Sequence, residues 1–558
     1  MEAYIVNKSI YSYKRDEVLS KLQEDEFELL IIGGGITGAG IALDATSRGM
    51  KTALVEMQDF AAGTSSRSSK MIHGGLRYLK NLEVKIVAQV GRERAIVFEN
   101  GPHVTTPEWM ILPLYEKGTF GRFSASMGLQ FYDFLAQVKK DERKSMLSRE
   151  QTLQLEPKFK QEGLLGSGRF VEYRSDDARL TIEVMKEAEH HGATVINYTK
   201  VTDFIYKDGK VAGVYTIDQL TGITGEIHAK KVINAAGPWV DTLREKDHSM
   251  DNKQLHLSKG IHLVFDQQVF PLKQSVYFDT QDGRMVLAIP RGEKTYIGTT
   301  DTDYEGDIIH PRVTVSDRDY IIDVINYIFP ELEITPNDVE SSWAGLRPLI
   351  HESGKGLSQI SRKDEIWESK SGLITIAGGK LTGYRKMAET IVDVISLKFR
   401  QDNYKIFSPC HTKNMPISGG HVGGSQNFNV FIEEKTTQGM ALGLDIDIAT
   451  FLVKKYGSNI DRIYELIQNE GEEAVDYGIP TALYAQVIYS ITDEFVNTPV
   501  DFFSRRTGAL LFDIEWLNKW KVPVIDLMSK KLGWNADQKE TYQDDLEKHI
   551  HEATVAFE

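Results

Sequence analysis

The chain has 558 residues, 41% of them hydrophobic and 26% charged, a balance that excludes a disordered or collagen-like chain. This length exceeds one ordinary core, so we expect two or three domains. The net charge of −15 opposes broad attraction to nucleic acid, and the single cysteine, Cys410, excludes an internal disulfide, a cysteine-rich metal site and an iron–sulfur cluster.

The N-terminal sequence predicts no secretory signal. MEAYIVNKSIYSYKRDE carries charges where a signal peptide would have its apolar region. The most apolar run, residues 29–45, is too short and too rich in glycine for a membrane-spanning helix. Because a lone cysteine also fits a reducing compartment, we expect a cytoplasmic protein whose membrane contact is peripheral.

The first predicted elements form a βαβ unit. A buried strand at 27–32 leads into a helix of small residues that ends near Arg48, and a second strand follows at 52–55. Later strand-like runs lie at 194–196, 211–217 and 231–234, and Asp208-Gly209 is typical of a hairpin turn.

The remaining chain divides into three stretches. Short β-rich runs fill residues 255–306. A strand at 373–377 and a helix at about 382–397 then return to the α/β pattern. Residues 408–428 are typical of a linker, and helical apolar spacing follows at 446–455, 481–495 and 536–556.

These patterns predict an α/β (α+β) fold with a discontinuous nucleotide-binding domain, a β-rich substrate or cap domain and a C-terminal helical domain. The expected boundaries are an N-terminal lead-in at 1–26, the nucleotide-binding domain at 27–110, 160–258 and 372–397, the substrate domain at 111–159 and 259–371, a linker at 398–428 and the helical domain at 429–558.

A dinucleotide motif lies between the first strand and the first helix. The turn at 33–38 reads GGGITG and satisfies G-x-G-x-x-G, and Glu56 ends the second strand at the spacing of a ribose-binding acid. Gly33 permits the tight turn, Gly35 lets a pyrophosphate approach the helix N-terminus, and Gly38 lets helix and strand pack closely. This motif alone leaves both NAD and FAD open.

Three later segments favour FAD. The run at 63–70 offers hydroxyl groups for a pyrophosphate and ribityl chain, 234–239 closes a strand with small residues, and 378–382 opens a helix that could face the flavin pyrimidine edge. His73, before a glycine pair, is expected to shape the flavin loop. The candidate cofactor-binding residues are Gly33, Gly35, Gly38, Glu56, Thr64, Ser65, Ser66, Ser68, Ser69, Lys70, His73, Gly237, Trp239, Gly379, Lys380, Leu381 and Thr382.

Several longer motifs resemble the FAD-dependent glycerol-3-phosphate dehydrogenases, of the glycine-oxidase and D-amino-acid-oxidase superfamily, nearly end to end. They are TSSRSSKMIHGGLRYL at 64–79, DDARL at 176–180, NAAGPW at 234–239, KGIHLVF at 259–265, IGTTDTDYEGD at 297–307, AGLRPL at 344–349, GGKLTGYRKMAE at 378–389 and TPVDFFSRRTGALLF at 498–512. The resemblance implies a Rossmann-like FAD-binding domain, a D-amino-acid-oxidase-like substrate domain and an all-α C-terminal domain. It also implies oxidation of sn-glycerol 3-phosphate, with electrons passed to a membrane quinone.

The resemblance also implies a substrate site. Oxidation of a secondary alcohol needs a base, a hydride acceptor and fixed cations for the phosphate. The family's substrate positions fall on Arg77, Arg347, Arg362 and Lys380, although an isolated arginine is more often part of a surface ion pair. Arg347, held between Leu346 and Pro348, is the strongest candidate and is also assigned to catalysis.

His262 is the candidate base or alcohol-orienting group. It lies in the apolar run 261–265, where a lone histidine is more often a core residue, but the resemblance places a histidine here beside the flavin. Thr299 is expected to contact substrate or flavin. No metal site is predicted, because the fourteen histidines show no H-x-x-x-H or HExxH spacing, and His549 is expected to be a surface residue.

A mixed aromatic and basic stretch at 115–144 is able to sit at a bilayer surface, and the resemblance favours this role, on the inner face of the cell membrane. Its members are Phe120, Phe123, Met127, Phe131 and Phe134 with Lys117, Arg122, Lys139, Lys140 and Arg143. An ordinary amphipathic helix is the alternative. Expected partners are glycerol 3-phosphate and quinone but no nucleic acid, and a homodimer stays open. Rival functions are a glycerol-3-phosphate oxidase that uses O2, an amino-acid oxidase and a flavin redox sensor without turnover.

Overall fold

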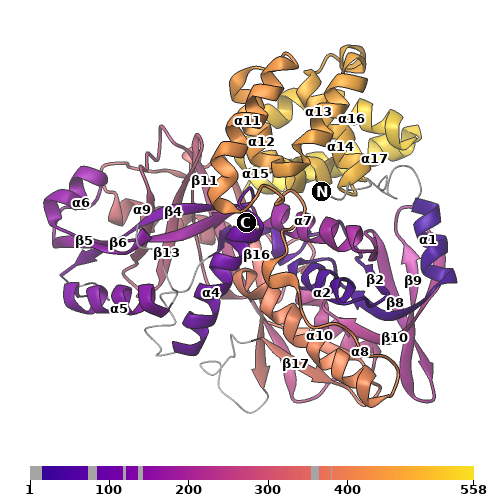
Figure 1. The fold of residues 1–558 in the computed structure, drawn as a ribbon. Helices are drawn as coiled ribbons and strands as arrows, with labels where there is room; N and C mark the ends of the chain where they lie inside the picture. Colours follow the sequence, from indigo (N-terminus) through magenta and orange to yellow (C-terminus); the bar gives the residue numbers. More distant parts are fainter. Residues whose placement is uncertain are drawn as a thin grey trace.

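The computed structural model describes residues 15–72, 84–116, 118, 121–135, 142–352, 364–378 and 380–558. Two sheets lie side by side, and a bundle of C-terminal helices lies above the region where they meet (Figure 1). Each sheet supplies one wall of the site described below.

The first sheet is built around parallel strands. Its order is β17 (Glu365–Glu368), β18 (Ile374–Ala377), β10 (Thr224–Asn234), β1 (Glu26–Ile32), β2 (Thr52–Val55) and β7 (Thr194–Ile196). The strands from β18 to β7 are mutually parallel, and β17 is antiparallel to β18. A hairpin of β8 (Thr199–Lys207) and β9 (Lys210–Asp218) continues antiparallel from β10.

Both faces of this sheet are covered, which explains why residues 29–32 of β1 are an uninterrupted apolar run. Leu29 and Ile31 pack into a core with helices from one face, and Leu30 and Ile32 pack into a second core on the other. The first face carries α2 (Ile36–Ser47), α7 (Asp177–His190) and α10 (Tyr384–Gln401), and the second carries α1 (Arg15–Glu24). A short helix, α8 (Val240–Lys246), follows β10.

The second sheet is mostly antiparallel. Its order is β15 (Thr302–Asp303), β11 (Lys253–Asp266), β14 (Lys294–Gly298), β13 (Met285–Arg291), β12 (Ser275–Asp279), β4 (Thr105–Tyr115), β6 (Leu164–Ser175) and β3 (Met71–Ile72). The long strand β16 (Ser341–Glu352) pairs with β11, and β5 (Ser145–Leu147) pairs with β6. The accompanying helices are α4 (Val84–Asn100), α5 (Arg122–Leu135), α6 (Arg149–Leu155) and α9 (Val315–Ile328).

The C-terminal domain has its own hydrophobic core. Its helices are α11 (Phe428–Ala441), α12 (Ile446–Tyr456), α13 (Ile460–Glu470), α14 (Thr481–Asp493), the π-helical turn η11 (Asp501–Arg506), α15 (Ala509–Phe512), α16 (Ile514–Leu532) and α17 (Ala536–Thr554). The predicted helical domain is therefore confirmed, and its helices at 446–455, 481–495 and 536–556 agree with the observed bounds to within two residues.

The predicted domain boundaries differ from the observed strands in several places. Residues 105–110, 164–175 and 253–258 were assigned to the nucleotide-binding part, but they belong to β4, β6 and β11 of the second sheet. These strands pair along most of their length, so they cannot be divided between two sheets. The predicted linker packs against the first domain, because Ile417 lies in its core. The lead-in contains α1, whose Arg15 binds Asp218.

Candidate active site

The site begins where the parallel strands of the first sheet end. Because β18, β10, β1 and β2 run in the same direction, their carboxyl ends meet at one edge, where α/β sheets bind ligands. Each strand is followed there by one of the predicted cofactor segments, at 378–382, 235–239, 33–38 and 56. The fold thus brings together segments that are far apart in the sequence.

A cavity of about 340 Å³ lies at this edge. The predicted cofactor residues among its lining are Gly33, Gly35, Glu56, Thr64, Ser65, Ser68, Gly237, Trp239, Lys380 and Leu381. Gly33 has a positive φ of 118°, and a Cβ there would lie 2.5 Å from the Ala235 carbonyl oxygen. Gly38 lies outside the lining, and its Cβ would collide with the Gly33 carbonyl oxygen, so it serves the close helix–strand packing expected of it.

Glu56 faces the cavity from the end of β2. Its Oε2 accepts a hydrogen bond from the Gly34 N–H at 2.6 Å, and its Oε1 accepts one from the Gln58 N–H at 2.8 Å. Burial raises the pKa of this carboxyl group, and the two backbone donors act in the opposite direction. Glu56 therefore stabilises the conformation of the glycine turn. It also faces the position expected for a ribose.

The hydroxyl-rich loop at 63–70 divides between two environments. Ser65 Oγ accepts a hydrogen bond from the Ile36 N–H at 2.9 Å, at the first turn of α2. Ser66 and Lys70 do not line this cavity or the second one described below. The buried Lys70 ammonium needs a counterion, which Asp177 provides. Lys70 Nζ donates to Asp177 Oδ1 at 2.7 Å and to the Ser66 carbonyl oxygen at 2.9 Å.

A second cavity, of about 310 Å³, adjoins the first and reaches into the second sheet. Thr64, Ser68, Pro348, Gly378, Lys380 and Leu381 line both cavities. The other predicted residues in its lining are Ser69, His262, Thr299, Arg347 and Thr382. The two cavities together are long, with the glycine turn and α2 at one end and a polar pocket at the other. This shape suits an extended dinucleotide with a substrate beside it.

His262, on β11, is held in a defined position. Its ring stacks on Trp343, with 4.5 Å between centroids and 9° between planes, and its Nε2 lies 3.0 Å from Ser69 Oγ. Burial, followed by the charges of Arg347 and Lys70, lowers the pKa of His262 well below its usual value. The imidazole is therefore neutral at pH 7 and keeps one nitrogen able to accept a proton.

Arg347, on β16, reaches the same pocket. Its Nη2 donates to Thr299 Oγ1 at 2.8 Å and its Nη1 donates to the Thr300 carbonyl oxygen at 3.1 Å. Its side chain is 31% exposed, so it is both fixed and accessible from the cavity. Arg347 and Thr299, predicted from different motifs, are thus direct neighbours.

Two cations in the pocket, Arg67 and Arg284, were not predicted. Burial and the nearby Arg505 lower the pKa of Arg67 to about 10, and its Nη1 donates to the Ile309 carbonyl oxygen at 3.1 Å. Arg67 lies inside the quoted motif TSSRSSK, so its position among the loop hydroxyls was the available signal. Of the predicted residues, His73, Arg77, Arg362 and Gly379 lie outside the described part of the chain.

The predicted membrane patch is described only in part. On α5, Met127 is 57% exposed and Phe131 43% exposed, and Arg143 is exposed beyond the helix. The remaining members of the patch, or their side chains, are not described. No helix in the described ranges is both long enough and apolar enough to cross a bilayer.

Comparison with known proteins identifies the family. Residues 28–385 match the family of FAD dependent oxidoreductases, and residues 410–539 match the C-terminal domain of alpha-glycerophosphate oxidase. An aerobic glycerol-3-phosphate dehydrogenase of Bacillus subtilis is 60% identical over 99% of this chain and 100% of its own length, and one of Staphylococcus aureus is 56% identical over 98% of both.

Solved structures give the same result. The glycerol-3-phosphate dehydrogenase of Bacillus halodurans, determined with FAD, is 50% identical and superposes with a TM-score of 0.85 over 98% of both chains. The L-alpha-glycerophosphate oxidase of Mycoplasma pneumoniae, 20% identical with a TM-score of 0.55 over 70% of this chain and 98% of its own, shares the fold. The chain belongs to the FAD-dependent oxidoreductases and, within them, to the family of aerobic glycerol-3-phosphate dehydrogenases.

Proposed function

We propose that this protein oxidises sn-glycerol 3-phosphate to dihydroxyacetone phosphate with FAD as its cofactor and passes the electrons to a membrane quinone. The observation that supports this most is the long double cavity, in which a neutral, positioned His262 lies beside Arg347. Relatives that are 56–60% identical over nearly the full length are named as aerobic glycerol-3-phosphate dehydrogenases.

The residues present fit FAD. The glycine turn leaves the first turn of α2 open to a pyrophosphate, Glu56 faces the position of a ribose, and the 235–239 and 378–382 segments line the continuation of the cavity. When bound, FAD supplies the acceptor for the hydride that leaves C2 of the substrate. The turn at Leu381–Gly383 leads into α10, whose N-terminal end would favour the negative charge that reduction places on a bound flavin.

The polar groups of the second cavity then have separate roles. Arg347, with Arg67, Arg284 and Lys380 around the same space, holds the substrate phosphate by charge-assisted hydrogen bonds. His262 takes the proton of the C2 hydroxyl, because its depressed pKa keeps the ring neutral and ready to accept. The stack on Trp343 and the contact with Ser69 restrict the ring to one orientation during that transfer.

An anaerobic titration tests the reaction. Addition of glycerol 3-phosphate to the FAD-loaded protein should bleach the visible flavin absorbance, whereas a redox sensor without turnover would show no bleaching. Arg347→Ala should lower kcat/KM by the equivalent of about 2 to 4 kcal/mol, mostly through weaker substrate capture. Arg149→Ala, at the exposed first residue of α6, is the matched control and should keep wild-type values. Wild-type kcat/KM in Arg347→Ala would refute the phosphate assignment.

The acceptor is tested separately. The exposed apolar side chains of Met127 and Phe131, with basic residues that follow α5, favour a membrane surface. Lys139→Glu, Lys140→Glu and Arg143→Glu together should lower binding to anionic liposomes and quinone reduction, but leave activity with a soluble dye intact. Peroxide formation in air at the rate of the dye assay would identify an oxidase instead.

A further inference from the structure

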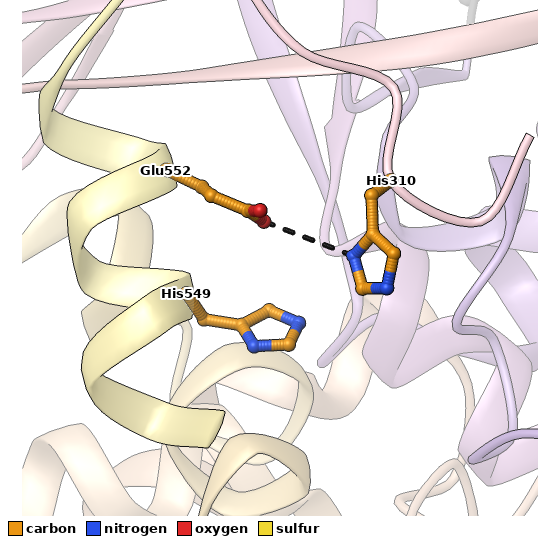
Figure 2. A group of neighbouring side chains, drawn as sticks. All are labelled: His310, His549 and Glu552. Carbon is orange, nitrogen blue, oxygen red and sulfur yellow. Dashed lines mark ion pairs between the residues drawn. The ribbon is translucent and has the colours of Figure 1, made fainter. Parts of the chain in front are cut away.

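Three possible metal ligands meet where the C-terminal domain contacts the second sheet. His549 and Glu552 lie one turn apart on α17, and His310 lies in the segment that leads to α9 (Figure 2). All three side chains are partly buried, and one ligand atom from each lies within 4.8 Å of the others. Figure 2 shows both side chains of α17 directed toward His310, with Glu552 Oε2 at 3.7 Å from His310 Nδ1.

The hydrogen bonding of His549 prepares it for a metal. Its Nδ1 lies 2.8 Å from the Asp545 carbonyl oxygen, and because a carbonyl oxygen only accepts, Nδ1 must donate. In the neutral ring, Nε2 therefore carries the lone pair. Metal-binding histidines are typically fixed in this way, with one nitrogen donating to a carbonyl or carboxylate and the other on the ion.

The surrounding charges also suit a cation. One positive charge, on Lys548, lies near His310, and the neighbouring carboxylates outnumber it. Glu552 and Asp307 face His310 with negative charge, and Asp545 faces His549. A tetrahedral zinc site places its ligand atoms about 3.4 Å apart, as Zn–N bonds of about 2.1 Å require. His310 and Glu552, at 3.7 Å, are near this spacing, and the three ligand atoms, all within 4.8 Å of one another, can reach it by side-chain rotation.

We propose that His310, His549 and Glu552 form a binding site for a divalent metal ion of the zinc class, with water in the fourth position. Two imidazoles and one carboxylate are a usual ligand set for zinc with one open position. The sequence pattern predicted no metal because the ligands come from two distant segments, and His549, expected at the surface, is partly buried against His310.

Such an ion would fasten the segment before α9 to the C-terminal domain. The chain end already pairs with this segment, since the Val315 N–H donates to the Phe557 carbonyl oxygen and the Phe557 N–H to that of Val313, both at 2.8 Å. Next to His310, Ile309 lines the first cavity, and its carbonyl oxygen accepts from Arg67 of the second cavity. The proposed ion therefore lies one residue from the wall of the active site.

Calorimetric titration with Zn²⁺ tests the site on the full-length, FAD-loaded protein after treatment with a chelator. We expect saturable binding of one Zn²⁺ ion per chain. His549→Ala and Glu552→Gln should each weaken binding by at least about tenfold, the lower end of the loss that even an outer partner of a metal site causes. His551→Ala, an exposed histidine on the same helix, is the matched control and should bind as the wild type does.

A second cluster of histidines around a glutamate could also account for zinc binding. Glu187 lies within 4 Å of His190, His191 and His421, so adventitious zinc could bind there. Zn²⁺ should raise the melting temperature of the wild type and of the His191→Ala/His421→Ala variant, but not of His310→Ala. Absence of saturable binding, or binding that persists in His310→Ala and disappears in His191→Ala/His421→Ala, would overturn the proposal.

Discussion

A buried ion cluster joins the C-terminal domain to the loop that follows β2. Asp59 is fully buried and accepts hydrogen bonds from Arg505 Nε at 2.5 Å, from Arg506 Nη1 at 2.6 Å and Nη2 at 2.9 Å, and from Asn197 Nδ2 at 3.0 Å. Burial alone would raise the pKa of Asp59, but the charges of Arg506 and Arg505 hold it below the usual value. We predict that this carboxylate is a major source of stability at the domain junction.

The test is Asp59→Asn, which removes the charge with little change of volume. Loss of one partner of a buried ion pair costs about 3 to 5 kcal/mol, because the remaining charge stays buried. Arg505 keeps Asp501 at 2.7 Å, and Arg506 keeps the Glu494 carbonyl oxygen. We therefore expect the lower end of that range, about 3 kcal/mol.

Hydrogen–deuterium exchange measures this locally and does not require two-state unfolding of a multidomain chain. A loss of 3 kcal/mol should lower the protection of amides in residues 499–512 by more than about 100-fold. Glu331→Gln, which breaks an exposed pair with Lys158, is the control and should change stability by less than about 1 kcal/mol. If Asp59→Asn costs no more than this control, the cluster is not held by its charges.

Three further predictions follow from the described contacts. Gly35→Val should abolish cofactor retention, measured by flavin absorbance, because its Cβ would lie 3.0 Å from Ser65 Oγ and its methyl groups would fill the pyrophosphate approach. Glu156 has a pKa raised to about 7 by burial, so the folded state holds this proton more tightly than the unfolded state does. The contribution of Glu156 to stability should therefore be greatest below pH 4.5 and fall by at most about 3 kcal/mol as the pH rises to 7, and Glu156→Gln should remove this part of the pH dependence in denaturant titrations. Arg347→Met should raise the pKa of His262, because the Arg347 charge contributes to lowering it, and should move the acid limb of the kcat/KM profile to higher pH.

Each of the three predictions can be contradicted by a specific result. A yellow Gly35→Val protein would show that the turn tolerates a branched side chain. An unchanged pH slope in Glu156→Gln would mean that other groups control stability in this range. An acid limb that stays in place in Arg347→Met would remove His262 as the group that titrates there.

Local patterns predicted β1, β2, β7, β9 and β18 of the first sheet accurately, but not β8 or β17. The strand expected at 27–32 is observed at Glu26–Ile32, and the one at 52–55 is identical, because both are buried apolar runs between turn residues. The Asp208-Gly209 turn is confirmed, since both residues have positive φ as a tight hairpin requires. The dinucleotide-binding role of the glycine motif could also be predicted from a local pattern, because its strand, turn and helix are contiguous in the sequence.

Long-range pairing could not be predicted in the same way. Nothing in residues 105–110 indicates that they continue a strand paired with 164–175, so the domain boundary was misplaced. The ion pair of Lys70 with Asp177 was not predicted, because the two residues are far apart in the sequence. The meeting of His310 with α17 was missed for the same reason.

The C-terminal domain contacts both walls of the double cavity. Arg505 and Arg506 bind Asp59, only three residues after Glu56 at the cofactor edge. On the other wall, Ser341 Oγ donates to the Leu511 carbonyl oxygen at 2.5 Å and Ser342 Oγ to that of Ala553 at 3.1 Å, at the start of the strand that carries Arg347. Catalytic groups need support that fixes them to within a fraction of an ångström. Because the domain contacts both walls of the double cavity, a shift of its helices would change the distance between the cofactor edge and the phosphate-binding strand.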